Sequence, residues 1–218
     1  MFKKVFGLVS IVMLSFVIIA CGDSGANDDE TATPNPTRGI WDGDIFVSEY
    51  LGLEFELPSG WSKLDDDEIA EFIGVVFLDG APEMGLEFPD EVLEALEGGQ
   101  FHDMLAIHPF EGTNVQIIFE RNAIAMLISE EEYLETVVEQ FEEVSGLGME
   151  FRDFEIASEP TTIGNYDWQL LSAVIELGPG IEMESHTFVS IQGPNIRVIT
   201  ITLGFGSDTL EDVISMFN

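Results

Sequence analysis

The chain has 218 residues, and its 42 Asp and Glu outnumber its 7 Lys and Arg, which gives a formal charge of −35. Such a charge repels phosphate backbones, so we exclude nucleic acid as a partner. Because 45% of the residues are hydrophobic and 17 are Phe, the chain is not a disordered acidic tail. A folded part of about 180 residues is the size of one domain and can bury roughly 70% of its unfolded surface.

The N-terminus has the pattern of an export signal. Lys3 and Lys4 precede an uncharged stretch at residues 5–19, which has the length of a signal-peptide apolar region and falls short of the ~20 residues of a membrane-spanning helix. Ile18-Ile19-Ala20-Cys21 then resembles the bacterial lipobox. That resemblance implies a diacylglyceryl group on the Cys21 thiol, removal of a signal peptide of residues 1–20, and a mature chain that begins at Cys21.

Cys21 is the one cysteine of the chain, so it cannot form an internal disulfide, and its position favours modification over a structural role. An uncleaved anchor, or an ordinary secretory signal with an incidental cysteine, is the alternative. Residues 22–39 contain no large apolar side chain, which predicts a lipidated N-terminus and flexible tether over residues 21–40. We expect a single domain over residues 41–218.

The acidity bears on how the protein meets a membrane. Removal of the signal peptide takes away two lysines and no acid, so the formal charge becomes −37. Anionic lipid headgroups repel such a body, and we expect the acyl group to hold it at the membrane. The charge has two explanations: capture of calcium or a cationic partner, or adaptation to a saline or alkaline exterior. We favour adaptation, because acids occur in every segment of the mature chain.

The first half of the domain predicts a hairpin and two short helices. Residues 53–57 alternate apolar side chains with glutamates, which predicts a strand with one wet face, and residues 45–47 are close enough to pair with it. Cap and apolar positions predict helices over residues 65–74 and 89–98. Residues 75–88 show no assignable pattern.

The second half is rich in strands. Residues 101–110 and 114–122 predict a hairpin. Ser129 and Glu132 form a capping box, and an apolar stripe then predicts a helix that ends at Gly146. A last helix is expected behind a cap at Ser207 or Asp208. Four more strands are expected over residues 149–157, 166–177, 183–191 and 196–203.

These elements define a fold class. Sequential strands joined by short turns are antiparallel, and amphipathic helices must bury their apolar stripes against the sheet. We therefore predict an α+β fold, with an antiparallel β-sheet flanked by helices on both faces. Trp41, Trp61 and Trp168 are expected in its core.

The order of elements resembles the PsbP-like superfamily, which includes many bacterial lipoproteins. The stretches that carry the resemblance are YLGLEFELPSGW at 50–61, DDDEIAEF at 65–72, ISEEEYLETVVEQFEEV at 128–144, IGN at 163–165 and RVITITLGFGSDTLEDVISMF at 197–217. The resemblance implies an α/β/α sandwich and a role as a binding or assembly module. It transfers no functional residue, because it includes no shared site motif.

The sequence shows little catalytic chemistry. It contains no HExxH, GxSxG or phosphate-binding glycine loop. His102 and His108 would lie about 20 Å apart on one strand, too far to share a metal, and we expect structural roles for both and for His186. The run Asp65-Asp66-Asp67-Glu68 is a weak calcium candidate, because it lacks EF-hand spacing and acids at a helix start also suit the helix dipole.

The sequence therefore predicts a lipoprotein that is held at the cell membrane through Cys21, faces the extracytoplasmic side, and binds a protein or small ligand without catalysis or a cofactor. Two alternatives stay open. One is an extracytoplasmic hydrolase with a carboxylate pair, which would require one carboxyl with a raised pKa. The other is a calcium-dependent adhesion or envelope protein.

Overall fold

The computed structural model describes residues 36–65, 67–69, 100–121, 123–145, 150–206 and 208–218. The predicted signal peptide, Cys21, Asp66, residues 70–74 of the helix expected over 65–74, and the helix expected over residues 89–98 lie outside these ranges. Within them, no helix has the length and hydropathy needed to cross a membrane.

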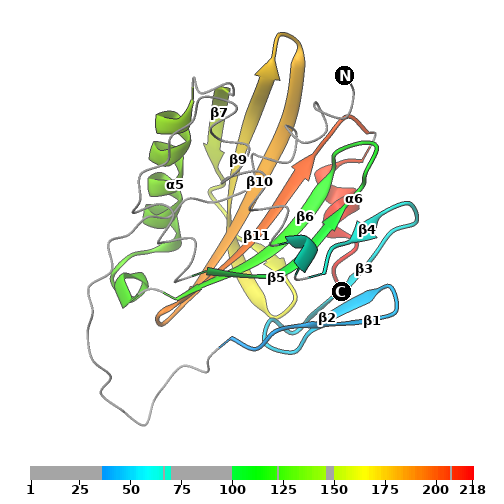
Figure 1. The fold of residues 1–218 in the computed structure, drawn as a ribbon. Helices are drawn as coiled ribbons and strands as arrows, with labels where there is room; N and C mark the ends of the chain where they lie inside the picture. Colours follow the sequence, from blue (N-terminus) through cyan, green and yellow to red (C-terminus); the bar gives the residue numbers. More distant parts are fainter. Residues whose placement is uncertain (1–35, 66, 70–99, 122, 146–149, 207) are drawn as a thin grey trace.

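A large antiparallel sheet forms the centre of the molecule (Figure 1). Its strands follow the order β4-β5-β6-β11-β10-β9-β7, and β8 pairs with β9 beside this path. Every strand pair in it is antiparallel, as predicted. The strands are β4 (Ser62–Lys63), β5 (Gln100–Ile107), β6 (Asn114–Arg121), β7 (Glu150–Ile156), β8 (Thr161–Ile163), β9 (Tyr166–Gly178), β10 (Ile181–Gln192) and β11 (Asn195–Leu203).

A second sheet of three strands was not expected from the sequence. It consists of β1 (Ile40–Asp42), β2 (Ile45–Ser48) and β3 (Leu53–Glu56). The predicted β2–β3 hairpin is confirmed, and β3 alternates buried and exposed residues as expected. The chain end extends this sheet, because the backbone N–H groups of Glu54 and Asn218 donate to each other's carbonyl oxygens at 3.0 and 2.9 Å.

Helix α5 (Glu130–Val144) has the predicted start. The Glu132 backbone N–H donates to Ser129 Oγ at 3.2 Å, and the Ser129 N–H donates to Glu132 Oε2 at 2.8 Å. Its apolar stripe, which includes Tyr133, Val137 and Phe141, packs on one face of the large sheet. We call this the α5 face. A short 3-10 helix, η3 (Ala123–Leu127), precedes α5.

Helix α6 (Leu210–Ile214) begins one or two residues later than predicted. Its N-cap is Thr209, which exchanges hydrogen bonds with Asp212, rather than Ser207 or Asp208. Asp208 and Thr209 each have an acid three residues further on, so this spacing does not choose between them. The observed start at Thr209 buries Val213 completely.

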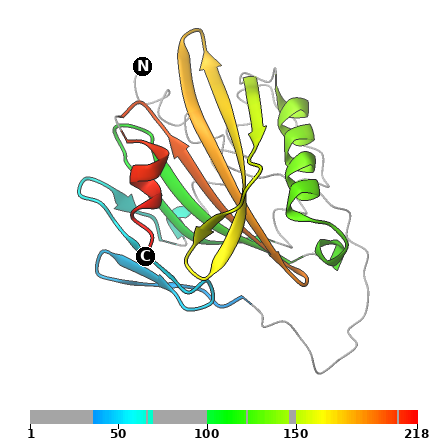
Figure 2. The same ribbon diagram turned by 180° about the vertical axis from the view of Figure 1, so that it is seen from behind.

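The large sheet therefore has an apolar core on each face. On β11, Ile196 and Val198 contribute to the core on the α5 face, whereas Ile199 and Ile201 contribute to the opposite core. The opposite core also contains buried residues of β2 and β3 together with Val213 of α6, and we call this side the small-sheet face. Figures 1 and 2 show α5 beside β7 and α6 beside the three-stranded sheet. The α+β class with helices on both faces is confirmed, although the small sheet provides much of the second cover.

Strand β7 lies at one edge of the large sheet. Its register with β9 shifts between Arg152 and Glu155, and Asp153 in this irregularity has a φ of 56°. Glu150, Asp153 and Glu155 are exposed along the strand. A bulge and charged side chains are features that blunt an exposed sheet edge.

Candidate functional site

Asp65 and Glu68, the first and last residues of the weak calcium candidate, form a helix cap. Residues 67–69 are helical. The Asp65 N–H donates to Glu68 Oε2 and the Glu68 N–H donates to Asp65 Oδ1, both at 2.9 Å. Two of the four acids therefore bind backbone N–H groups. Across the described ranges, no group of three His, Cys, Asp or Glu side chains is arranged to hold a metal ion.

The three tryptophans lie in the core of the small-sheet face, as predicted. Trp168 is fully buried and donates its indole N–H to the Ile163 carbonyl at 2.9 Å. Trp61 is nearly buried, and Trp41 packs against the same core. Their large apolar surfaces thus have a structural role.

A cavity of about 320 Å³ lies where β11 ends. The β10–β11 pairing stops at Glu184 opposite Leu203, while β10 continues to Ile181 in its hairpin with β9. This hairpin extends past the neighbouring strands in Figure 1. The part of β10 beyond the end of β11 thus forms a step in the sheet, and the start of α6 closes the space above it. The lining consists of Val174, Glu182, Met183, Glu184, Leu203, Gly204, Gly206, Asp208, Thr209 and Leu210. We call this cavity the step pocket.

The step pocket combines acidic and apolar side chains. Glu182, Glu184 and Asp208 bring carboxylates to it, and Leu203 and Leu210 bring apolar surface. Arg152 on β7 donates from Nη2 to Glu182 Oε1 at 2.6 Å, so one carboxylate is already paired. Ligand pockets typically combine apolar lining with a few polar groups. The lining is suited to a ligand with a positive and an apolar part.

His186 of β10 lies beside this pocket. Its Nδ1 is 2.9 Å from Ser172 Oγ on β9, and its Nε2 is 3.4 Å from Glu184 Oε2. The second contact has the distance of an ion pair but lacks hydrogen-bond geometry, and Nε2 makes no hydrogen bond. Burial lowers the pKa of His186, and the nearby Glu184 carboxylate offsets part of that effect.

The order serine, imidazole and carboxylate also occurs in acyl-transfer enzymes. Here Ser172 and His186 are direct cross-strand partners, so the sheet register alone brings them together. The sequence held a signal for this pair: both positions are seven residues from Pro179 in the β9–β10 turn, and Glu184 precedes His186 by two. Residues two apart on a strand share a face. Ser172 and Glu184 were not among the residues singled out from the sequence.

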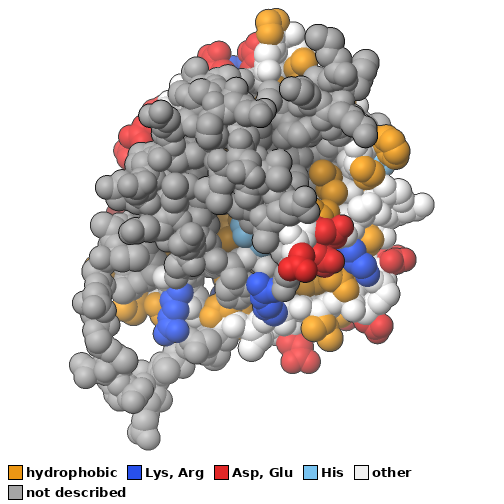
Figure 3. Space-filling view, in the orientation of Figure 1, with side chains coloured by type: hydrophobic (Ala, Val, Ile, Leu, Met, Phe, Trp, Pro, Cys, Tyr) orange, Lys and Arg blue, Asp and Glu red, His pale blue; other side chains and the backbone are white. Residues whose placement is uncertain are grey.

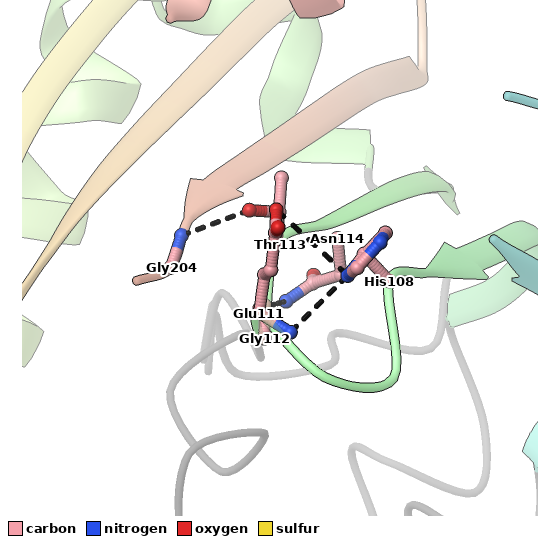
Figure 4. Close-up of polar contacts among 6 residues, drawn as sticks. All are labelled: His108, Glu111, Gly112, Thr113, Asn114 and Gly204. Carbon is pink, nitrogen blue, oxygen red and sulfur yellow. Dashed lines mark hydrogen bonds and ion pairs between the residues drawn. The ribbon is translucent and has the colours of Figure 1, made fainter. Parts of the chain in front are cut away.

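The β5–β6 turn supports another wall of the step pocket (Figure 4). Within the turn, the His108 N–H donates to the Thr113 carbonyl at 2.8 Å, and the Glu111 N–H donates to His108 Nδ1 at 3.1 Å. The Gly204 N–H donates to Thr113 Oγ1 at 3.1 Å. His108 and Thr113 thereby fix the turn against Gly204, and the predicted structural role of His108 agrees with these contacts.

A buried cation lies elsewhere on the small-sheet face. Arg197 is 1% exposed, and its Cζ lies 3.7 Å from the Tyr166 ring centroid and 5.2 Å from that of Tyr50. Its Nη2 donates to Gln192 Oε1. The Tyr166 hydroxyl donates to the Tyr50 carbonyl at 3.2 Å. The cluster joins β9, β11 and the turn before β3, so we assign it a structural role.

The α5 face also contains a buried patch of uncharged polar side chains on three adjacent strands. Thr200 Oγ1 in this patch makes no hydrogen bond. Cross-strand pairing places its members side by side, and they are Asn114, Gln116, Ser185, Thr187, Thr200 and Thr202.

The fold and pocket define an α+β protein with a partly apolar, acidic cavity. No family model matches the chain, and no curated protein matches it. Among solved structures, it is similar to cyanobacterial PsbP (CyanoP) from Synechocystis sp. PCC 6803, with 14% identity, a TM-score of 0.46, and coverage of 84% of this chain and 97% of that one.

Two further solved structures are similar. LpqN, involved in cell envelope biogenesis of Mycobacterium tuberculosis, has 11% identity, a TM-score of 0.36, and coverage of 75% of this chain and 76% of that one. A protein from Bacteroides thetaiotaomicron has 15% identity and a TM-score of 0.40 over 81% of this chain. This chain spans 48% of the length of the Bacteroides protein.

Proposed function

We propose that the protein is a lipid-anchored, extracytoplasmic module that binds a ligand without transforming it. The observation that carries the proposal is the lipobox-like Ile18-Ile19-Ala20-Cys21 behind an export signal, and the step pocket supports the binding role. Strand β1 begins at Ile40, so the eighteen residues 22–39 separate Cys21 from the first strand. A flexible chain of that length has an r.m.s. reach of roughly 25 Å.

Mass spectrometry of the protein isolated from the membranes of its own cells tests the anchor. We expect a mature N-terminus at Cys21 with a diacylglyceryl group on the thiol, and incorporation of labelled palmitate in growing cells. Cys21→Ser should abolish the label, whereas the nearby Ser24→Ala should keep it. An intact Met1, or an unacylated Cys21, contradicts the proposal.

Crosslinking in intact cells tests the binding role. A reactive group placed at an exposed position near the pocket, such as Glu211, should capture a partner from outside the cytoplasm. The same group at Glu135 on the exposed side of α5 is the matched control. Equal capture from both positions would show random encounter and contradict a binding surface near the pocket.

The hydrolase alternative has one observation in its favour, the contact of Ser172 with His186. The carboxylate pair that we considered requires a raised pKa. Within the described ranges, the carboxyls with a shifted pKa are Glu132 and Asp212, and hydrogen bonds from Ser129 and Thr209 lower both pKa values. Hydrolysis of a model ester that Ser172→Ala abolishes would replace the binding proposal with this alternative.

The calcium alternative has a direct test in calorimetry of the full chain with calcium chloride. The described acids Asp65 and Glu68 are occupied by backbone N–H groups. We therefore expect weak, nonspecific heats that Asp65→Asn does not change. A saturable calcium isotherm that this substitution removes would favour an adhesion or envelope role for that run.

A further inference from the structure

The step pocket has unpaired negative charge. Arg152 binds Glu182, but among the described residues no Lys or Arg contacts Glu184 or Asp208. The Glu184 side chain is 63% exposed, so it is available to a ligand from solvent. Because Arg152 neutralises only Glu182 among the pocket carboxylates, the pocket keeps an excess of negative charge, and this charge attracts a cation.

A second observation concerns His186, which is 7% exposed. Its Nε2 is buried, makes no hydrogen bond, and points to within 3.4 Å of Glu184 Oε2. When the ring carries its hydrogen on Nδ1 and donates it to Ser172 Oγ, Nε2 is an acceptor. Two acceptors then face each other without a hydrogen between them. A group that donates hydrogen bonds to both would satisfy a buried atom that is costly to leave unpaired.

We propose that the step pocket binds the primary ammonium group of a small organic cation. The carboxylates of Glu184 and Asp208 would neutralise its positive charge, and the apolar lining would contact its carbon chain. The inference rests on the proposed binding function and names its ligand class. An ammonium group has three N–H donors, so it can bond Glu184 Oε2 and His186 Nε2 together. The exposed Glu184 side chain can turn to admit it.

The lining favours an amine over a bare metal ion. Calcium takes six to eight oxygen ligands, and the described residues offer no metal-binding group of three. The pocket is also lined by the aliphatic side chains of Leu203, Leu210 and Val174. These side chains carry no ligand atoms for a metal ion, but they can bury methylene groups. A cavity of about 320 Å³ is at the small end of ligand pockets, which suits a short aliphatic amine.

The test is calorimetry of the full chain in detergent at a fixed ionic strength, with 5-aminopentan-1-ol as the probe. Pentane-1,5-diol is the matched neutral compound, because it replaces only the ammonium group. We expect millimolar affinity for the amine, as is usual for a ligand of about seven heavy atoms, and binding of the diol at least tenfold weaker. Equal binding of the two compounds would overturn the proposal.

Substitutions locate the binding. Glu184→Gln should weaken amine binding roughly fivefold, which is the scale of a partly exposed charge contact. Glu135→Gln, on the exposed side of α5, changes the net charge equally and should leave the affinity unchanged. An equal loss in both variants would show attraction by net charge alone, and displacement of the amine by calcium chloride would show an inorganic cation site. Each result contradicts the proposal.

Folding and anchoring are controlled separately. Circular dichroism and melting curves should match between the Glu184→Gln and Glu135→Gln proteins, and Asp208→Asn provides a second pocket variant if Glu184→Gln unfolds. If both pocket variants still bind the amine as the unsubstituted protein does, the proposal is overturned. If the protein incorporates palmitate but does not bind the amine, only this inference is contradicted. If the protein binds the amine but incorporates no palmitate, only the proposed anchor is contradicted.

Discussion

His102 on β5 shows how burial couples one side chain to pH. Burial, and secondarily the positive charge of Arg38, lower the pKa of His102 from 6.5 to about 4. The folded state therefore binds fewer protons than the unfolded state between these values. Its contribution to stability is complete above pH 6.5 and is lost as the pH falls to about 4. The shift corresponds to at most about 3 kcal/mol.

This shift predicts that the free energy of unfolding falls as the pH decreases from 6.5 to 4, and that His102→Gln reduces the slope. Urea denaturation at several pH values measures it. His108→Gln removes the imidazole of the residue that directly follows β5 and serves as the control. A His102→Gln protein whose pH profile parallels that of the unsubstituted protein would contradict the prediction. The comparison of slopes excludes any pH-independent cost of the substitution.

At the residue scale, contacts between residues close in sequence could be predicted. Ser129 and Glu132 are three residues apart, and that spacing alone specifies their reciprocal bonds. The contact of Ser172 with His186 depends on the register of β9 and β10. Predicting it requires placing the turn at Pro179, from which both residues are seven positions away. Arg197 could not be placed, because Tyr50 lies 147 positions away in the sequence and only the tertiary fold joins them.

At the scale of elements, the β5–β6 turn and the end of β11 pack so closely that a Cβ atom at one glycine position would clash with the backbone. A Cβ atom on Gly204 would lie 1.9 Å from the Glu111 carbonyl oxygen. The Phe205 N–H donates to that same oxygen at 2.7 Å, so the backbone cannot retreat without losing this bond. The substitution Gly204→Ala forces the two segments apart.

We expect Gly204→Ala to cost roughly 2–3 kcal/mol of stability, the range of an overpacked contact, in chemical denaturation. Gly206→Ala is the matched control. A Cβ there would lie 2.0 Å from Glu111 Oε2, which is the end of a side chain that can rotate away, so its cost should be well below 1 kcal/mol. Equal costs for the two variants would show that the close approach does not constrain the segment.

The elements that were predicted correctly have strong periodicity. The β9–β10–β11 strands and α5 agree with their predicted ranges within a few residues, because alternation and the 3.6-residue stripe persist over many positions. Strand β1 has three residues, too few for a pattern, and its first residue falls within the predicted tether. The cap of α6 was missed because Ser207, Asp208 and Thr209 are all cap-forming types.

The charge of the whole molecule predicts its response to salt. The formal charge is −35, and acidic side chains appear at several separate places in the view of Figure 3. Repulsion among them destabilises the compact state. Added salt shortens the screening length from about 30 Å at 0.01 M to about 3 Å at 1 M, and should therefore raise the melting temperature.

Calorimetric melting in sodium chloride from 0.01 to 1 M measures this effect. Most of the rise should occur below about 0.3 M, where screening changes fastest, and potassium chloride should give the same curve. A melting temperature that is flat or falls with salt would contradict the prediction. A rise confined to molar concentrations would point to preferential exclusion of the salt instead.

The layered arrangement could be predicted only in part. Apolar alternation in β3 indicated one buried face, but nothing local indicates which surface that face covers. The buried polar patch on the α5 face was missed for a similar reason. Thr200 and Thr202 alternate with isoleucines, which is the pattern of a strand with one exposed face, but both faces of β11 are buried. The step pocket arises from three separate segments, so its lining emerges only with the complete fold.

The irregular, acidic edge at β7 has a consequence for crowding. Molecules tethered to one surface share two dimensions and collide far more often than free ones. A smooth strand edge would then recruit its neighbours into an extended ribbon. Here Asp153 interrupts the regular backbone, and Glu150 and Glu155 present like charges. If the proposed lipid anchor holds many copies on one surface, this edge should therefore disfavour strand pairing between neighbouring copies.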